Sequence, residues 1–385
     1  MPVVFTRLEL TNWRNFKNVD IALSPRVFVA GPNASGKTNL LDAIRFLRDI
    51  AAPGGSLLRA VEERRGLKHI RSLHAGGNSN VVVSVDLTID GPDDTWTYTL
   101  EISGSETKNK TMKIEREHVV HRGQTVLERP GPGDDDALVL SQTHLEQVSQ
   151  NRRFRPLAEA LASVVAVHIV PQVARTPARA EEFSRREAPG SDFIDQLARL
   201  PDSSQKRALR RIEKLLRSAV PRFSNLSVTR DKLGRPHLDA SYAHWRRRGG
   251  LQNEQEFSDG TLRLVGVLWA IDTGTTPLLL EEPELSLHRD VVRQLPRLFG
   301  QAAARTGRQI IVSTHAEEMF SDTGIDSSEV ILLEPSEHET KVVPGTQKAE
   351  IQAAVENRIP LGPIITGLTK PPEIERLAMP PGAES

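Results

Sequence analysis

The sequence predicts an α/β fold in which short buried strands alternate with helices, and three observations carry that prediction. A glycine-rich loop at 31–38 joins an apolar segment at 27–30 to residues 39–50, whose apolar side chains recur at helical spacing. Earlier and later segments alternate apolar and polar residues, as half-buried strands do. Beyond Gly260 the α/β alternation returns, and the expected elements are helix 261–272, strand 278–281, helix 289–304, strand 309–313 and strand 329–333.

The remaining elements follow from the same periodicities. Further strands are expected at 4–10, 19–23, 81–89, 96–102 and 112–120. An amphipathic helix is expected at 205–218, because Leu209, Ile212, Leu215 and Leu216 share one face. Pro221 ends it, and residues 226–242 suggest a hairpin. The last fifty residues are weakly patterned, so no element is predicted there.

Composition excludes several functional classes. Fifty Lys and Arg balance fifty Asp and Glu, so no global field attracts nucleic acid or an anionic membrane. The absence of cysteine excludes disulfides, thiolate metal sites and cysteine nucleophiles. No segment reaches the roughly 20 apolar residues of a membrane helix, and no targeting sequence precedes the first strand. We therefore expect a soluble cytoplasmic protein with no membrane partner.

The most specific motif is a complete G-x-x-x-x-G-K-[ST] between a predicted strand and a predicted helix. Its glycines let successive backbone N–H groups face one anion, and Lys37 adds a cation for the β- and γ-phosphates. The Thr38 hydroxyl is placed to bind Mg²⁺. The candidate nucleotide-binding residues of this phosphate-binding loop (P-loop) are Gly31, Pro32, Asn33, Ala34, Ser35, Gly36, Lys37, Thr38 and Asn39.

A second motif supplies carboxylates. The apolar run at 277–280 is too short for a helix and ends in the adjacent acids Glu281 and Glu282. Where the strand ends the chain turns, so Glu281 can face Mg²⁺ while Glu282 polarises the attacking water. The sequence therefore predicts an ATP-binding site that uses Mg²⁺.

Four segments together resemble the ABC-type ATPase heads of the SMC, RecF and OLD group, often described as AAA-type ATPases. Residues 281–288 (EEPELSLH) look like the group's Walker B and D-loop segment, and residues 257–263 (FSDGTLR) are similar to its signature motif. Residues 310–315 (IIVSTH) match its switch-histidine strand, and residues 10–16 (LTNWRNF) resemble its opening motif. The resemblance implies a two-lobed P-loop NTPase head with antiparallel N-terminal strands and a second lobe of helices and strands.

The resemblance also implies roles for individual residues. Lys37, Glu282 and His315 would be catalytic, and Arg14 would contact nucleotide phosphates. Ser258, Asp259 and Gly260 would face the γ-phosphate bound by a second subunit, so that a homodimer or higher homo-oligomer encloses two ATP molecules. The metal ligands would be Thr38, Glu281 and Gln142.

Two of these assignments depart from the family pattern or leave alternatives open. The family often has Asp where this chain has Glu281, although the OLD-like branch also uses Glu, and Arg289 stands where Pro is common. Gln142 is our choice for the glutamine that links Mg²⁺ to the second lobe, with Gln147 and Gln150 as alternatives.

The expected organisation is one ATPase domain at 1–335 and a C-terminal extension at 336–385. Lobe I would comprise about 1–140 and 275–335, with lobe II, about 141–274, inserted between them. The insertion is too short for SMC-type coiled coils, and residues 316–385 lack the clustered acids of the TOPRIM nuclease domain that OLD proteins carry.

Three functions remain open from the sequence. By resemblance alone, the first is an ATPase that controls a separately encoded effector protein in bacterial defence. The second is a RecF-like repair factor that binds DNA, and the third is a non-hydrolysing ATP-bound scaffold. Candidate DNA contacts are Lys206, Arg207, Arg210, Arg211, Lys214, Arg217 and residues 245–248. Acids lie nearby at Glu181, Glu182, Glu187 and Glu213, and an ordinary solvated helix face is the alternative interpretation.

Overall fold

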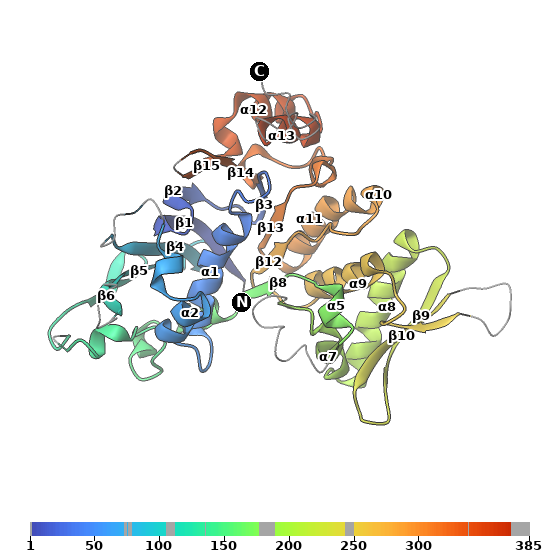
Figure 1. Ribbon diagram of the computed structural model, residues 1–385, viewed down its shortest axis with the longest axis horizontal. Helices are drawn as coiled ribbons and strands as arrows, with labels where there is room; N and C mark the ends of the chain where they lie inside the picture. The colour runs from blue at the N-terminus through green and yellow to red at the C-terminus, as the bar shows by residue number, and fades with distance from the viewer. Residues whose placement is uncertain are drawn as a thin grey trace, which may run out of the picture.

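Two six-stranded sheets and one three-stranded sheet form the framework of the part of the chain that the structure describes (Figure 1). The computed structural model describes residues 2–72, 75, 79–104, 112–134, 136–176, 189–242, 250–337 and 339–370. The predicted α/β fold with antiparallel N-terminal strands is confirmed. The basic residues 245–248 and the acids Glu181, Glu182 and Glu187 lie outside the described residues.

The first sheet is antiparallel, in the order β2-β1-β4-β5-β6-β7. Its strands are β1 (Val3–Trp13), β2 (Phe16–Ala22), β4 (Val81–Ile89), β5 (Thr95–Gly104), β6 (Met112–His121) and β7 (Gln124–Arg129). Buried and less buried residues alternate along β4 and β5, as expected for a sheet with one face in the core. All the strands predicted in this region are present.

The second sheet is mainly parallel, in the order β15-β14-β3-β13-β12-β8, with β15 antiparallel at one edge. Its strands are β3 (Arg26–Ala30), β8 (Val165–Val167), β12 (Leu278–Glu281), β13 (Ile310–Thr314), β14 (Val330–Pro335) and β15 (Thr340–Pro344). Val27 and Val29 pack into one core and Phe28 and Ala30 into the other. Burial on both faces explains why these strands are continuous apolar runs.

Helices cover the sheets of lobe I. They are α1 (Lys37–Ala51), α2 (Leu57–Glu63), α3 (Leu67–Ile70), α4 (Arg155–Ala162), α10 (Arg289–Val292), α11 (Leu295–Thr306), α12 (Ala349–Glu356) and α13 (Gly362–Leu368). The predicted helix at 289–304 is divided into α10 and α11. The division falls just before Pro296, which lies in the first turn of α11, where its missing N–H costs no helical hydrogen bond.

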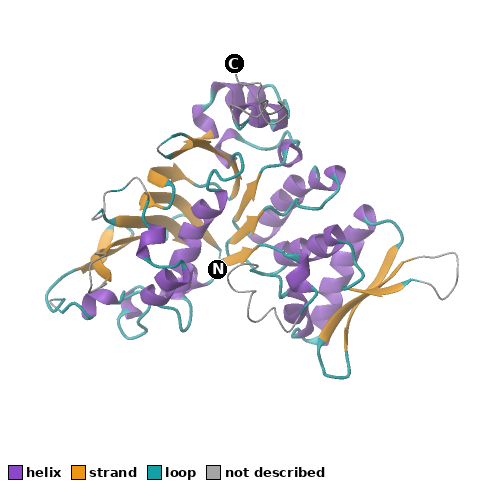
Figure 2. Ribbon diagram, in the orientation of Figure 1, coloured by secondary structure: helices purple, strands orange, loops and turns teal. Residues whose placement is uncertain are grey.

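Lobe II combines the three-stranded sheet with a group of helices, to the right in Figure 2. The strands are β9 (Phe223–Arg230), β10 (Pro236–Tyr242) and β11 (Leu251–Asn253), and the helices are α5 (Pro171–Ala174), α7 (Phe193–Ala198), α8 (Asp202–Ala219) and α9 (Asp259–Asp272). The predicted amphipathic helix is α8, which buries Leu209, Ile212 and Leu216. Leu215 was expected on the same face but is 44% exposed.

The boundary between the lobes falls later than residue 141. Phe154, which precedes α4, and Leu157 of α4 belong to the same core as β1 and α1, and β8 pairs with β12 in the parallel sheet. Residues up to the end of β8 therefore pack with lobe I, and lobe II begins with the chain that leaves β8.

Residues 339–370 extend lobe I instead of following it as a separate piece. Strand β15 pairs with β14, and Ile351 of α12 and Ile365 of α13 are buried in the core beneath the parallel sheet. The weak sequence pattern concealed this because β15 and each of the two helices are short. Within the described residues, no helix has the length and apolar composition needed to cross a membrane.

Candidate nucleotide-binding site

The P-loop connects β3 to α1, as the motif predicted. Gly36 has a φ of 96°, a left-handed conformation that favours glycine, and as N-cap it has no side chain to cap α1. The N–H groups of the first turn of α1 therefore have neither an intrahelical partner nor a side-chain cap. Together with the helix dipole they form a site suited to an anion.

The Lys37 side chain forms hydrogen bonds within the P-loop. Its Nζ donates to the backbone oxygens of Gly31, at 2.9 Å, and Pro32, at 3.0 Å. Burial lowers the pKa of Lys37, although the nearby Glu282 and Glu284 oppose this shift. The ammonium group thus lies under the loop, within reach of any anion that the loop binds.

Asn15, which was not predicted as a site residue, clamps the P-loop from the β1–β2 turn. Its Nδ2 donates to the Ser35 oxygen at 2.9 Å and to Thr340 Oγ1 at 2.8 Å. Its Oδ1 accepts from Asn39 Nδ2 at 2.8 Å. A Cβ at Gly36 would clash with the Asn15 side chain, so Gly36 is required here by packing as well as by its φ angle.

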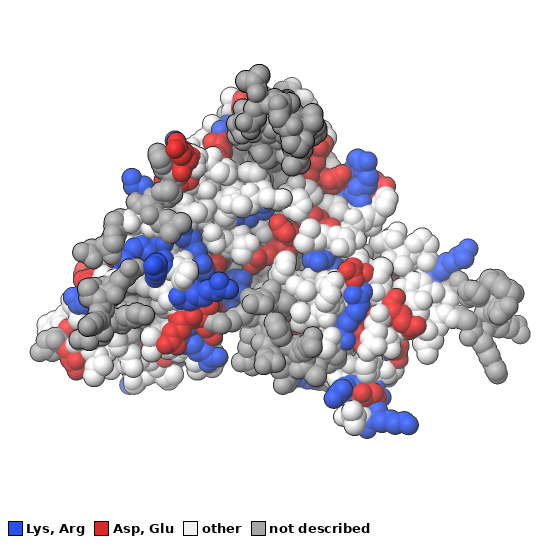
Figure 3. Space-filling model, in the orientation of Figure 1, with Lys and Arg blue, Asp and Glu red and all other residues white. Residues whose placement is uncertain are grey.

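Arg14 lies beside the P-loop and pairs with an acid of α1. Its Nη2 is 2.8 Å from Asp42 Oδ2, and the two side chains line a cavity of about 480 Å³ together with Thr38. In Figure 3, Lys and Arg side chains gather over α1 and α2, where this cavity lies. The structure thus brings the predicted Arg14 to the Thr38 side of the loop.

Glu281 is the last residue of β12, which lies in the same sheet as β3, the strand before the P-loop. Its carboxylate already forms an ion pair. Arg45 of α1 donates from Nη1 to Glu281 Oε1 at 3.0 Å, and both side chains are about nine-tenths buried. Arg45 follows Thr38 by seven residues and so lies on the same face of α1, two turns away. The sequence analysis did not identify Arg45.

Glu282 and His315 lie across from each other at the ends of β12 and β13. Glu282 has a φ of 43°, and His315 Nδ1 is 3.4 Å from its Oε1. This contact lowers the pKa of Glu282 and raises that of His315. Both shifts favour a carboxylate next to an imidazolium, so the predicted catalytic pair is assembled in the structure.

Glu284 accepts hydrogen bonds from the end of β13, where His315 of this pair lies. Its Oε1 accepts from Thr314 Oγ1 at 2.6 Å and from the His315 backbone N–H at 3.2 Å. Burial raises the pKa of Glu284. The pattern Glu-Glu-Pro-Glu held the signal for this residue, which fixes the position of the His315 backbone.

Gln142 does not reach this edge in the structure, which corrects the predicted metal ligand. It follows β7, where its backbone oxygen accepts from Arg129 and its side chain contacts Gln147. Strand β7 is the outer edge of the antiparallel sheet, and the chain passes through α4 before β8 joins the parallel sheet. The residue that does lie at this edge is His168, whose Nδ1 is 3.3 Å from the Glu281 backbone oxygen.

The signature segment begins α9, as predicted. Ser258 is the N-cap, and its Oγ accepts from the Thr261 N–H at 3.2 Å. Asp259 pairs with Arg175 at 2.6 Å. A Cβ at Gly260 would clash with the Ser286 backbone oxygen, so only glycine allows this close approach to the segment after β12. The start of α9 therefore lies against Ser286 and Leu287.

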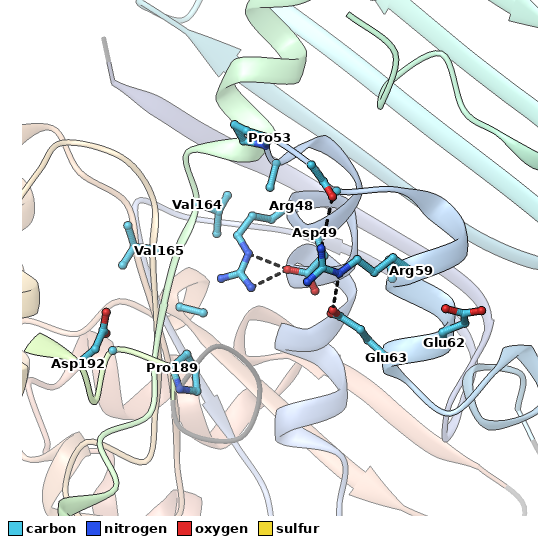
Figure 4. A pocket seen from close by; sticks show the side chains of 16 residues that line it. Arg48, Asp49, Pro53, Arg59, Glu62, Glu63, Val164, Val165, Pro189 and Asp192 are labelled. Atoms are coloured by element: carbon cyan, nitrogen blue, oxygen red, sulfur yellow. Dashed lines mark hydrogen bonds and ion pairs between the residues drawn. The ribbon is translucent and has the colours of Figure 1, made fainter. Parts of the chain in front are cut away.

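A larger cavity, of about 890 Å³, opens where the C-terminal end of α1 approaches α2 and the start of lobe II (Figure 4). Four of its charged side chains pair with one another, because Arg48 lies 2.6 Å from Asp49 and Arg59 lies 3.1 Å from Glu63. Neither the P-loop nor the acids at the end of β12 line it. The smaller cavity, in contrast, is lined by Thr38 and Asn39 at the end of the P-loop motif.

The residues at this edge fit Mg²⁺ and ATP. An uncapped helix N-terminus and the Lys37 ammonium group suit phosphates, and the exposed Thr38 faces the cavity beside them. Glu281 offers the carboxylate that Mg²⁺ commonly takes in addition to phosphate oxygens. Thr38 and Glu281 would hold the metal, and the P-loop would hold the phosphates.

Comparison with known proteins agrees with this geometry. The model of the family described as "AAA domain, putative AbiEii toxin, Type IV TA system" matches residues 26–318. The chain is similar to the DNA replication and repair protein RecF of Arthrobacter sp., at 32% identity over 171 residues, or 42% of this chain and 36% of that protein. RecF of Brucella abortus is 36% identical over 90 residues, so the match spans 23% of this chain and about a fifth of its relative, 21%.

Solved structures support the same fold. An Smc head bound to the C-terminal winged-helix domain of ScpA is similar, with a TM-score of 0.52, 14% identity, and coverage of 88% of this chain and 96% of that one. An Smc head from Pyrococcus furiosus gives a TM-score of 0.50 at 13% identity, covering 92% and 100%. These likenesses establish that the chain has the fold of an Smc head. The chain belongs to the AAA-domain family described as putative AbiEii toxin of a type IV toxin–antitoxin system, and its P-loop fold is like that of Smc heads.

Proposed function

We propose that this chain is a Mg²⁺-dependent ATPase that dimerises around two ATP molecules and thereby controls a separately encoded effector. The observation that carries the proposal is the convergence of four groups at one sheet edge: the uncapped start of α1, Thr38, Glu281 and the Glu282–His315 pair. Each group has the chemistry that phosphoryl transfer to water requires.

The residues divide the catalytic work between them. Bound ATP with Mg²⁺ would supply the transferable phosphoryl group and a metal that neutralises its charge. Lys37 and the P-loop N–H groups orient the phosphates, and Glu282 orients and polarises water. Its lowered pKa keeps it ionised at neutral pH. His315 holds Glu282 in place and can donate a proton to an anion at this edge.

Dimerisation would complete the site. Gly260 lies against Ser286 and Leu287 of its own chain, so the start of α9 packs beside the segment that follows β12. A second copy would place that helix start against the phosphates at Lys37. Binding of ATP between two copies then stabilises the dimer, by an amount that grows with the logarithm of the ATP concentration above its Kd.

Effector control rests on the family. Its description names a type IV toxin–antitoxin system, in which the ATPase would act with a second, separately encoded component. Opening and closing of the dimer would expose or cover the surface that this component binds.

The enzymatic part of the proposal is tested by phosphate release from purified wild-type protein and its Glu282→Gln variant. We expect Mg²⁺-dependent turnover that falls by about 100-fold or more in the variant, because water loses its polarising carboxylate. Nucleotide affinity should change by less than about threefold, since no binding charge of the P-loop is removed. Equal turnover in both proteins would overturn the catalytic role of Glu282.

DNA binding is the second candidate, favoured by the RecF similarity and by exposed basic side chains on α8. Two of these side chains lie near acids, because Arg211 pairs with Asp272 and Arg217 approaches Glu213. The other exposed basic residues of the helix are Lys206, Arg207, Arg210 and Lys214. If this function is correct, duplex DNA binds more tightly with ATP, and its affinity falls steeply with salt. The assembled Glu282–His315 pair argues against a scaffold that never hydrolyses ATP.

A further inference from the structure

The buried ion pair between Arg45 and Glu281 occupies the carboxylate that the proposed function assigns to Mg²⁺. Arg45 Nη1 lies 3.0 Å from Glu281 Oε1, and the two side chains are 10% and 9% exposed. A charge-assisted hydrogen bond at this burial is stronger than one at the surface. Glu281 therefore has a resident cationic partner before any metal arrives.

The length of the Glu281 side chain contributes to this arrangement. Glutamate has one methylene more than the aspartate that related heads often use at this position, which extends the carboxylate toward α1. Because Arg45 shares a face of α1 with Thr38, the guanidinium lies on the helix face that also carries the threonine proposed to bind Mg²⁺. Both residues line the cavity of about 480 Å³.

Arg45 also has other acids within the same cavity. Asp42 and Asp49 lie three residues before and four residues after it on α1, and both line that cavity. Asp42 is close enough to Arg45 for their charges to interact, although its hydrogen bonds come from Arg14 and Arg64. A guanidinium released from Glu281 would thus remain near Asp42 and Asp49, which Arg14, Arg48 and Arg64 also contact.

We propose that Arg45 is a positioning residue that competes with Mg²⁺ for Glu281, so that opening this ion pair sets the Mg²⁺ concentration at which the ATP site is completed. The inference rests on the proposed function, since it assumes that ATP and Mg²⁺ bind at this edge. A purely structural pair would instead tie α1 to β12 and leave the Mg²⁺ requirement unchanged when Arg45 is replaced.

The test is binding of a fluorescent, non-hydrolysable ATP analogue, measured at equilibrium over a series of free Mg²⁺ concentrations. In Arg45→Gln we expect the Mg²⁺ midpoint to fall by about tenfold, a typical coupling between two binding events. Affinity without Mg²⁺ should stay within about twofold of wild type. Arg45→Lys should give an intermediate midpoint, because an ammonium group makes a weaker contact with a carboxylate than a guanidinium does.

Controls separate the possible failures. Arg48→Gln removes a neighbouring arginine of α1 that pairs with Asp49, and it should leave the midpoint unchanged. Combining Arg45→Gln with Glu281→Gln should give the midpoint of Glu281→Gln alone, since Arg45 acts only through Glu281. An unchanged or higher midpoint in folded Arg45→Gln and Arg45→Lys would overturn this inference, whereas failure of the wild-type protein to bind the analogue would overturn the proposed function instead.

Discussion

The N-termini of α1 and α9 are the two helix starts proposed to bind phosphate, and the structure prepares them differently. Gly36 gives α1 no side-chain cap, whereas the Ser258 hydroxyl already accepts the Thr261 N–H in α9. Lys37 and Asn15 donate three hydrogen bonds of 2.9–3.0 Å to the loop before α1, and two more of 2.8 Å join Asn15 to Asn39 and Thr340. This difference indicates that the site at the start of α1 is formed within one chain, while the start of α9 needs a phosphate bound by another copy.

The largest effect that would test this contrast concerns Lys37. Lys37→Ala should reduce ATP affinity by about 100-fold or more, because a charge-assisted contact to phosphate is worth up to about 3 kcal/mol. Ser258→Ala should leave the affinity of the monomer within about twofold. Isothermal titration at protein concentrations that keep the chain monomeric measures both, with the exposed Lys17→Ala as the charge-matched control. Equal losses of ATP affinity in Lys37→Ala and Ser258→Ala would contradict the proposed difference between the two helix starts.

A smaller effect is expected at Asn15. Asn15→Ala leaves the Ser35 oxygen, Asn39 Nδ2 and Thr340 Oγ1 without their partner. Unsatisfied groups of this kind cost about 1–3 kcal/mol each where water cannot reach them, so we expect about 2 kcal/mol less stability and about tenfold weaker ATP binding. Chemical denaturation and titration measure the two quantities.

Asn18→Ala is the matched control for that experiment, because Asn18 lies exposed on β2, three residues from Asn15. Loss of stability with full ATP affinity in Asn15→Ala would show that the clamp supports the fold without shaping the P-loop.

The smallest effect is the pH dependence of the His315–Glu282 pair. The pKa of His315 is raised above 6.5 in the folded chain, so the stability that it contributes is complete below pH 6.5 and is lost as pH rises through the raised pKa. The pKa of Glu282 is lowered, so its contribution is present above pH 4.5 and is lost as pH falls through the lowered pKa. The pair is 41% and 30% exposed, which limits it to about 0.5 kcal/mol.

Denaturation of wild type and His315→Gln across this range tests the sign. The difference in free energy of unfolding should shrink as pH rises above the His315 pKa. A difference that grows with pH would contradict the assigned ion pair.

The sequence was sufficient for the parts of this site that local chemistry determines. The P-loop, the Ser258 cap and the acids at 281 and 282 each lie where a strand or helix begins or ends, so motif and periodicity located them. Contacts between distant segments could not be predicted from the sequence. Asn15 forms a hydrogen bond with Thr340, which is 325 residues away, and Arg45 forms one with Glu281, which is 236 residues away. Gln142 was misplaced because sequence alone did not show that the parallel sheet gains β8 after α4.

The same limit explains the C-terminal region. Strand β15 is five residues long, and the sequence between it and β14 carries no strong turn signal. Its burial comes from the sheet that it joins, and not from its own pattern.

The central claim is that ATP joins two copies through the start of α9. The most direct test is the mass of purified Glu282→Gln protein, by light scattering with and without Mg²⁺ and ATP. We expect the Glu282→Gln protein to be a monomer without nucleotide and a dimer with it. When Ser258→Arg is added to this variant, we expect a monomer in both conditions. A mass that does not change with ATP, or a dimer that persists in the combined variant, would contradict the central claim.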